Sequence, residues 1–406
     1  MSFLRSVFLM LVGLIALPFL LLRFGGGMFR AISHNPFKDM DEERAQTHVR
    51  LVASKPSVAT GEDVFRAAAD LASADKWDEL SAMLHDAVAS KTMTSPMKRD
   101  YEHVTAGARA GLTSLLEKLP IEQCTKAVDQ MLERFDAAAD AAPSDPARAA
   151  IAARAHLDVG WAWRGDGFSG GVSDEGWQKM NDHFQAASAR IEPFFDADPL
   201  FPPIAHAAHI IARQEGDPDT LEKVYELWRA SDAGNPTLYS EHAFHLLPRW
   251  GGSHAKLAQT AQRAATIDPE AYGAAPTLWL YLGVLECEPE ALAEADPELF
   301  VDAVRDHLYL DGTSRGANTL LRDLSELWLS IPIDGAQNEP FGTVREICKD
   351  ACRAIVDEHL TEIDLDVWDG SATEARQIIG LLYKDEIDEG YLLDFESGAL
   401  ELKKAA

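Results

Sequence analysis

The sequence predicts an all-α protein: a tetratricopeptide-like α-solenoid of stacked helical hairpins behind an N-terminal transmembrane helix. Three observations lead to this fold class: helix starts at similar intervals, apolar stripes of helical period, and a long uncharged segment near the N-terminus. Each start is an Asp or Asn followed by Pro, which favours a capped first turn. The starts are Asp198-Pro199, Asn235-Pro236, Asp268-Pro269 and Asp296-Pro297, with the prolines 37, 33 and 28 residues apart. A helical hairpin repeated about every 34 residues is typical of tetratricopeptide repeats.

Paired helix starts between residues 199 and 290 define the predicted hairpins. The first helices are expected at Pro199, Pro236 and Pro269, and their partner helices near Pro218, Ser253 and Pro289. Each hairpin leaves an apolar face that only a neighbouring hairpin can cover, so the units are expected to stack.

Apolar side chains recur with the helical period from residue 61 onward. One stripe extends over four turns and contains Ile121, Cys124, Val128, Met131, Leu132 and Phe135. The predicted organisation is a membrane anchor (1–24), a juxtamembrane connector (25–60), a helical-repeat domain (61–290) and a C-terminal helical extension or cap (291–406). Within it, a short helix is expected near 41–53, and alternating apolar residues predict a strand hairpin at 391–402.

The anchor is predicted from Ser6–Leu22, a stretch without a charged residue between Arg5 and Arg23. As a helix it spans about 25 Å, close to the thickness of the hydrocarbon core. A cleaved signal peptide is the alternative, but the run ends in leucines and Arg23 rather than in small residues. More positive charge follows the segment than precedes it, so the main domain is expected in the cytoplasm, on a single-pass protein of a bacterial inner membrane. The four scattered cysteines do not suggest a disulfide framework.

The composition is acidic, with 66 Asp and Glu against 37 Lys and Arg and a net charge of −29. Such a surface repels phosphate backbones and argues against nucleic acid as a partner. It favours a basic protein or peptide partner, with solubility alone as the alternative explanation.

Two segments carry a family resemblance. They are WAWRGDGFSGGVSDEGW, Trp161–Trp177, and PRWGGS, Pro248–Ser253. Together they resemble an uncharacterised bacterial family, a domain of unknown function built from tetratricopeptide-like helices. The resemblance covers about residues 60–290 and implies a helical-repeat fold without an established activity.

The residues of PRWGGS also have a direct physical interpretation. Pro248 is expected to end a helix, Gly251 and Gly252 to form a tight link, and Ser253 to cap the next helix. We expect Trp250 to fill the gap between the two helices. Arg249 is expected either to hydrogen-bond carbonyls at the helix end or to face a groove. The candidate binding residues of the two segments are Arg164, Asp166, Arg249 and Trp250.

The segment Gly165–Gly170 spells GxGxxG, the pattern of dinucleotide-binding loops. That pattern binds a nucleotide only where a strand leads into the loop and a helix follows it. A helix is predicted to enter here, so neither a nucleotide nor a nucleotide cofactor is expected.

Two histidine pairs occupy equivalent positions in consecutive predicted repeats. His206 and His209 lie in HAAH, and His242 and His245 lie in HAFH. Each pair has i, i+3 spacing and so shares one helix face. Stacked repeats can bring the four imidazoles together as a zinc site, with Glu241 beside them. The alternative is that histidine fills a semi-polar position and bonds to a backbone group or carboxylate.

Cys348 and Cys352 are spaced i, i+4, with His359 further along the helix. This pattern can begin a metal site, but the apolar neighbours on the same face favour core packing.

Two functions follow from these observations. The first is a membrane-tethered interaction scaffold that holds a partner segment in its groove, with no cofactor. The second is a zinc-dependent hydrolase that uses the paired histidines. The absence of HExxH or another catalytic signature favours the first.

Overall fold

The computed structural model describes residues 36–56, 60–95, 97–165, 171–331 and 339–404. This part of the chain is mostly helical with few strands, so the predicted all-α class is confirmed. The expected anchor, 1–24, lies outside the described residues. Among the described residues, no helix is both long enough and apolar enough to cross a bilayer.

The chain folds as two compact units, which are described separately here. One comprises Ser57–Gly252 and is called the 57–252 unit; the other combines Met1–Pro56 with Ser253–Ala406 and is called the composite unit. The predicted domains, with limits at 60 and 290, divide the chain differently because they were drawn from repeat spacing, and they stay a prediction.

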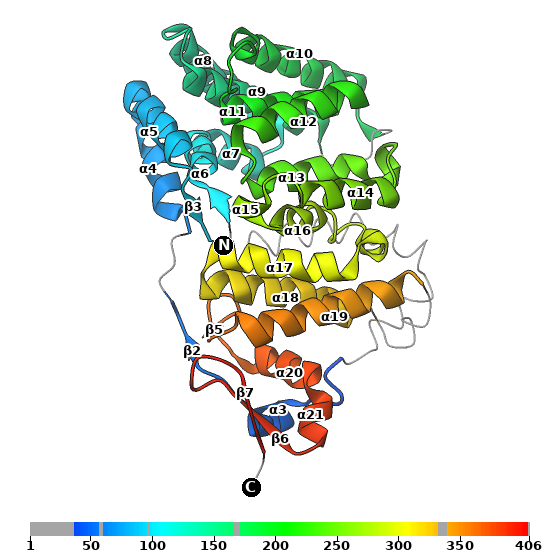
Figure 1. The fold of residues 1–406 in the computed structure, drawn as a ribbon. Coiled ribbons are helices and arrows are strands. Elements are labelled where there is room, and N and C mark those ends of the chain that lie inside the picture. The colour runs from blue at the N-terminus through cyan, green and yellow to red at the C-terminus, as the bar shows by residue number, and fades with distance from the viewer. Residues whose placement is uncertain (1–35, 57–59, 96, 166–170, 332–338, 405–406) are drawn as a thin grey trace. The chain divides into compact units, whose positions relative to one another are not determined.

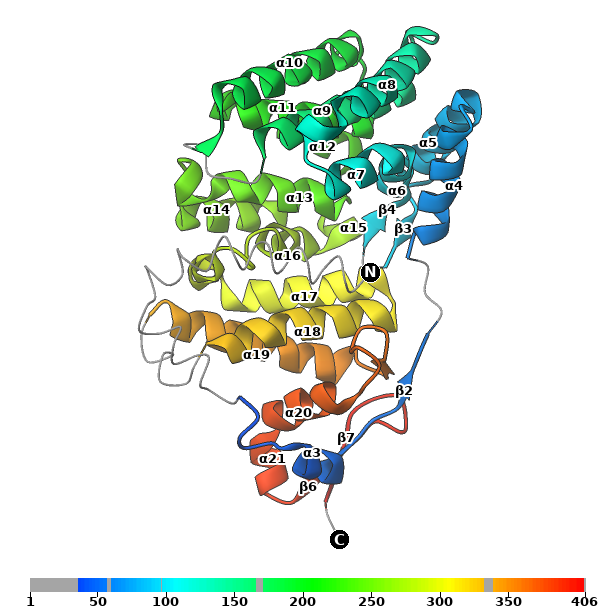
Figure 2. The same cartoon turned by 180° about the vertical axis from the view of Figure 1, so that it is seen from behind.

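The 57–252 unit is built from helices that pack in sequence order (Figures 1 and 2). Helix α9 packs against α8, α10 and α11, and α11 packs in turn against α12. The elements are α4 (Glu62–Ser73), α5 (Trp77–Ser90), β3 (Met93–Thr94), β4 (Lys98–Arg99), α6 (Asp100–Ala108), α7 (Ala110–Lys118), α8 (Ile121–Asp140), α9 (Pro146–Arg164), α10 (Asp174–Ile191), the 3-10 helix η2 (Glu192–Phe194), α11 (Pro202–Glu215), α12 (Pro218–Asp232), α13 (Pro236–Ala243), and the 3-10 helices η3 (Phe244–Leu246) and η4 (Pro248–Trp250).

Two of the predicted proline-led starts are confirmed in this unit, and one is wrong. Helices α12 and α13 begin at Pro218 and Pro236, each with a side-chain cap from the preceding Asp or Asn. Helix α11 begins at Pro202 instead of Pro199. A helix from Pro199 would place Pro202 and Pro203 at its fourth and fifth positions, where their missing N–H groups would break the hydrogen-bond ladder.

Helix α9 is buried along most of its length. Its alanines let neighbouring helices approach closely, and Gly160 allows the contact with α10, because a Cβ there would lie 2.9 Å from the Phe184 ring. Between residues 147 and 160, only Arg148, Arg154 and Asp158 remain partly accessible. These residues form one polar stripe on an otherwise apolar helix. On α8, the predicted stripe from Ile121 to Phe135 is buried in the same core.

The composite unit contains the remaining helices and most of the short strands. Its elements are α3 (Glu42–His48), β1 (Val49–Arg50), β2 (Ala53–Ser54), α14 (His254–Ala264), α15 (Pro269–Tyr272), α16 (Ala275–Leu282), the 3-10 helix η5 (Pro289–Glu294), α17 (Pro297–Asp311), α18 (Ser314–Ser330), α19 (Phe341–Glu358), β5 (Ile363–Asp364), α20 (Thr373–Leu382), α21 (Lys384–Asp388), β6 (Tyr391–Asp394) and β7 (Glu401–Lys404).

In this unit, some of the predicted helices are short or are replaced by 3-10 helices. The start at Pro269 is confirmed, but α15 is only four residues long. It ends because Gly273 turns with φ 53° and Ala274 N–H bonds the Asp306 carboxylate at 2.7 Å. A partner helix at Pro289 was wrong, since this residue begins a 3-10 helix. The next start, at Pro297, follows too soon for a full α-helix.

The end of the predicted connector is an integral part of the composite unit. Strand β1 pairs in parallel with β6, and β2 pairs in parallel with β5. The predicted C-terminal hairpin is confirmed, since β6 and β7 pair antiparallel. Figures 1 and 2 both show α3 beside α20 and α21, with its blue ribbon next to the red C-terminal elements. The chain around Val49 therefore completes the C-terminal sheet.

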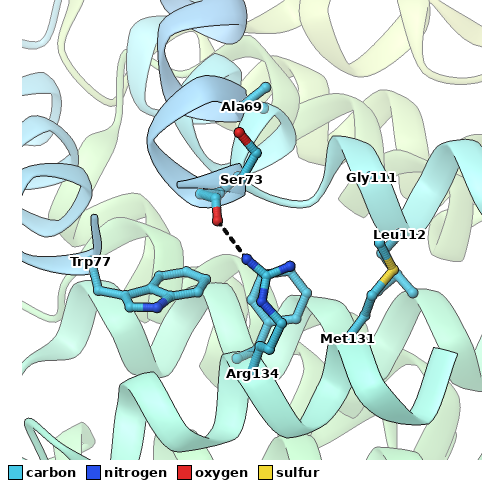
Figure 3. A pocket seen from close by; sticks show the side chains of 11 residues that line it. Ala69, Ser73, Trp77, Gly111, Leu112, Met131 and Arg134 are labelled. Carbon is cyan, nitrogen blue, oxygen red and sulfur yellow. Dashed lines mark hydrogen bonds between the residues drawn. The ribbon is translucent and has the colours of Figure 1, made fainter. Parts of the chain in front are cut away.

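A cavity of about 100 Å³ lies in the core of the 57–252 unit, among α4, α5, α7 and α8. Figure 3 shows Trp77 on one side of it and Gly111, Leu112 and Met131 on the other. Arg134 also lines it and is held by the Asp75 carboxylate and the Ala72 carbonyl. The cavity is therefore an apolar packing space with a neutralised cation at its edge.

The pairing of β1 predicts the result of a matched substitution. Val49 is 1% exposed, whereas Val52, three residues later, is 40% exposed. Val49→Asp should lower the unfolding free energy of the composite unit by about 3–5 kcal/mol, because it buries an unpaired charge. Val52→Asp should change it by less than about 0.5 kcal/mol. Urea unfolding followed by circular dichroism measures both, and equal effects would show that β1 does not belong to this core.

Two helical glycines predict stability changes of opposite sign. At Gly111 an added Cβ meets only the flexible Met131 Cε at 3.1 Å, while at Gly107 it would lie 2.2 Å from the Phe65 carbonyl oxygen. Gly111→Ala should stabilise the protein by about 0.5–1 kcal/mol through helix propensity. Gly107→Ala should destabilise it by about 1–3 kcal/mol through overpacking. Thermal unfolding of the two variants tests this, and a destabilised Gly111→Ala would contradict it.

Candidate binding surface

Three helices of the 57–252 unit place polar side chains in a first row. The row consists of Arg154 on α9, His206 on α11 and Glu241 on α13. His206 Nε2 lies 2.9 Å from Glu241 Oε1 and 3.3 Å from Arg154 Nη1. When His206 Nε2 carries a proton, it donates a hydrogen bond to the nearer Glu241 carboxylate. Because the Arg154 guanidinium can only donate, its contact with His206 Nε2 is then not a hydrogen bond. The His206 ring also lies flat on Trp228, with centroids 4.4 Å apart.

The electrostatics of Glu241 follow from this row. Burial raises the pKa of its carboxyl group, but His206 and Arg154 outweigh that effect and hold the pKa below the ordinary value of 4.5. Glu241 is therefore ionised at neutral pH and anchors His206.

A second row lies about two turns further along α9 and α11, and about one turn after Glu241. It consists of Trp161 on α9, Arg213 on α11 and His245 on η3. The Arg213 guanidinium lies over the Trp161 ring, 5.7 Å from its centroid. Burial and then the charge of Arg213 lower the pKa of His245 to about 3. Arg154 and Trp161, like His206 and Arg213, are seven residues apart. The helices therefore run in the same direction and present equivalent faces.

Two aromatic residues extend the second row to the surface. Trp250 is 55% exposed. Its ring centroid lies 5.7 Å from that of Phe244 and 5.8 Å from that of His245. Trp250 was expected to fill the gap between two helices, and this was wrong. The 3-10 turn of η4 lays its ring on Phe244 and His245 instead of in the core.

The link after Trp250 is built as predicted. Gly251 has φ 86°, and Gly252 N–H bonds the Leu247 carbonyl at 3.1 Å. A Cβ at Gly252 would lie 2.0 Å from the Leu246 carbonyl oxygen, so only glycine fits. Ser253 Oγ accepts from Lys256 N–H and caps α14.

The other candidate binding residues border this surface. The guanidinium of Arg249 lies 5.8 Å from the Phe244 centroid, and that of Arg164 lies 5.9 Å from the Trp161 centroid. Arg164 also donates to the Gly165 carbonyl. Asp166 and the rest of the GxGxxG pattern lie outside the described residues, but α9, a helix, leads into that loop as expected.

The four predicted histidines approach one another only in part. His209 Nε2 lies 3.4 Å from His242 Nδ1, and the His209 and His245 ring centroids are 6.5 Å apart. His206 turns away toward Glu241 and Trp228. Among the described residues, no group of three or more His, Cys, Asp or Glu side chains has an arrangement that could hold a metal ion. The zinc site at His206, His209, His242 and His245 therefore has no support in this part of the chain.

The buried imidazoles instead form a short chain. His242 Nε2 lies 3.5 Å from Glu222 Oε2, and the His242 ring stacks on Tyr225 with centroids 3.8 Å apart. A proton on His242 Nε2, facing Glu222, leaves His242 Nδ1 to accept from His209 Nε2. His209 Nδ1, His242 Nε2 and His245 Nε2 are buried nitrogens without a hydrogen-bond partner among the described residues, so His242 and Glu222 interact only electrostatically. Burial lowers the pKa of both His209 and His245, so they are neutral at pH 7.

A buried polar network holds the start of α13 in place. Asp232 accepts from Arg99 and Tyr101. Asn235 Nδ2 donates to Tyr101 Oη at 2.6 Å and to Glu102 Oε1 at 2.9 Å. The Asn that begins α13 thus also fixes it against α6, and this positions Glu241 one turn later.

Cys348 and Cys352 are buried in α19 of the composite unit. Burial raises the pKa of Cys348 to about 12 and also raises that of Cys352. Both are core residues, as their apolar neighbours predicted.

The sequence alone did not point to Arg154 or Arg213. Arg213 lies seven residues after His206, so the helical period was the signal that could have found it. No family model matches the chain, and no curated protein or solved structure matches it significantly. The resemblance inferred from Trp161–Trp177 and PRWGGS therefore stays a prediction.

The buried histidines predict how stability depends on pH. Their folded pKa values lie below the ordinary value of 6.5, so the unfolded chain binds more protons as pH falls below that value. The unfolding free energy should therefore decrease from pH 6.5 toward pH 4. His245→Asn should reduce the slope of the unfolding free energy against pH, by an amount that corresponds to at most one proton bound on unfolding. Denaturant titrations at several pH values measure the slope, and an unchanged slope in the variant would contradict the assignment.

Proposed function

We propose that the 57–252 unit binds an extended segment of a partner protein across α9, α11 and η4. The observation that carries this proposal is the exposed Trp250, which lies on Phe244 and continues the row of His245, Arg213 and Trp161. An exposed aromatic residue beside arginine and smaller aromatic groups is typical of the centre of a protein interface. The helical packing supports the finer fold class, a tetratricopeptide-like solenoid whose inner helices line one surface.

The same proposal places the protein at a membrane. The uncharged segment Ser6–Leu22 is the argument for a transmembrane anchor, and the basic residues after it argue for a cytoplasmic main domain. The protein is then a tethered scaffold of a bacterial inner membrane. A hydrolase is not proposed, because its zinc site has no support among the described residues.

A photocrosslinking experiment tests the binding surface. The full-length protein carries a photoreactive phenylalanine at position 250 or, as a matched control, at Leu227, which is 42% exposed on α12 of the same unit. We expect position 250 to crosslink one partner segment, identified by mass spectrometry, and position 227 not to do so. A synthetic peptide of that segment should bind about tenfold more weakly to Trp250→Ala, the loss typical of an interface tryptophan.

Two results would contradict the proposal. One is equal crosslinking at positions 250 and 227. The other is a crosslinked peptide whose affinity, measured by fluorescence anisotropy, is unchanged by Trp250→Ala.

A further inference from the structure

We infer that the second row is a subsite for a carboxylate of the bound segment, with Arg213 as its ion-pair partner and Trp250 with Phe244 as the platform for an adjacent apolar side chain. This inference rests on the proposed function and adds the chemistry of the partner. The carboxylate belongs either to an Asp or Glu side chain or to a chain terminus, since the chemistry of recognition is the same.

The first argument is the lack of a partner for Arg213. It is half-buried, yet it has no hydrogen bond or ion pair with any residue in the described ranges. Most other half-buried or buried arginines of this unit are paired, although Arg154 meets only His206, at 3.3 Å. Arg99 meets Asp232 at 2.6 Å, Arg109 meets Asp158 at 2.6 Å, Arg148 meets Asp145 at 3.2 Å and Arg190 meets Asp136 at 3.0 Å.

Acidic residues are abundant in this chain, 66 in all. An unpaired and partly desolvated guanidinium is costly, so such groups are normally paired. The missing partner of Arg213 is thus supplied most simply by a ligand.

The second argument is the surroundings of Arg213. The Trp161 ring fixes the guanidinium from one side through a cation–π contact. The charge of Arg213 also lowers the pKa of His245, whose buried Nε2 has no hydrogen-bond partner among the described residues.

These groups suit a carboxylate in particular. A guanidinium presents two parallel N–H donors that match the two oxygens of a carboxylate. A neutral His245 can add a further N–H donor without the cost of a buried charge. Trp250 and Phe244 then offer an apolar face beside the anion, which favours an acidic residue next to an aliphatic or aromatic one.

The net charge of the chain predicted a basic partner. At this surface the local charge is positive, so we expect an acidic group there instead. Charges more than about 8–10 Å away are largely screened at physiological ionic strength. At this surface Arg164 and Arg213 lie against the Trp161 ring, and Arg249 lies against the Phe244 ring. The overall charge of −29 still disfavours a long polyanion such as nucleic acid, so the anion is a short one.

Selection from a phage library of random peptides tests this chemistry on the full-length protein. We expect the enriched peptides to carry Asp, Glu or a free C-terminus next to an apolar residue. The best peptide is then synthesised as it stands, with its acidic side chains changed to amides, and with its C-terminus amidated. Loss of binding in one of the last two forms identifies the source of the carboxylate.

Three variants of the protein complete the test. Arg213→Gln should lower the affinity for the selected peptide at least tenfold, and Arg213→Lys should lower it less. The matched control is Arg229→Gln, which removes an arginine of α12 that is already paired with Glu226 and should change the affinity less than twofold. Circular dichroism and thermal unfolding confirm that each variant is folded.

The outcomes separate this inference from the proposed function. Two results would overturn the carboxylate subsite without contradicting the binding surface. One is that peptides whose binding requires Trp250 are basic, and the other is that their affinity is unchanged by Arg213→Gln. If no selected peptide loses affinity on Trp250→Ala, both proposals are overturned.

Discussion

The close packing of α9 is the constraint on which the 57–252 unit depends. Its alanines and Gly160 leave almost no side-chain volume between this helix and α8, α10 and α11, so the neighbouring axes are held at short range. A helix buried on most sides has few positions left for polar groups. On α9 these are Arg148, Arg154 and Asp158, and Arg154 opens the first polar row. The apolar packing therefore also decides where the polar chemistry lies.

The two rows of the candidate surface have different electrostatic character. In the first row, Glu241 compensates His206 and Arg154, and the ionised carboxylate makes that row internally balanced. In the second row, Arg213 lies over the Trp161 ring, and its charge helps to keep His245 neutral. Balanced groups stabilise a fold, whereas an uncompensated group costs stability unless something binds it. This contrast is the reason for proposing a structural role for the first row and a binding role for the second.

The composite unit shows how distant segments can replace regular repeats. Gly273 and the Asp306 carboxylate end α15 after one turn, and the helix expected at Pro289 is only a 3-10 helix. In this unit, short parallel pairs between β1 and β6 and between β2 and β5 join the N-terminal segment to the C-terminal one. Such contacts are non-local, and no helix cap or apolar stripe in the sequence indicates them.

The sequence by itself determined the local features: the helical class, the capped starts at Pro218, Pro236 and Pro297, the glycine link after Trp250 and the C-terminal hairpin. These depend on interactions between residues close in the chain, such as the cap that Asn235 gives to α13, and their signals are therefore local. Only the tertiary structure decided which histidines meet, that Trp250 faces outward and that Arg213 lies over Trp161. Those outcomes depend on how helices far apart in sequence pack and on whether a charge finds a partner in space. The spacing of residues along the sequence indicates neither the packing of distant helices nor the pairing of a charge.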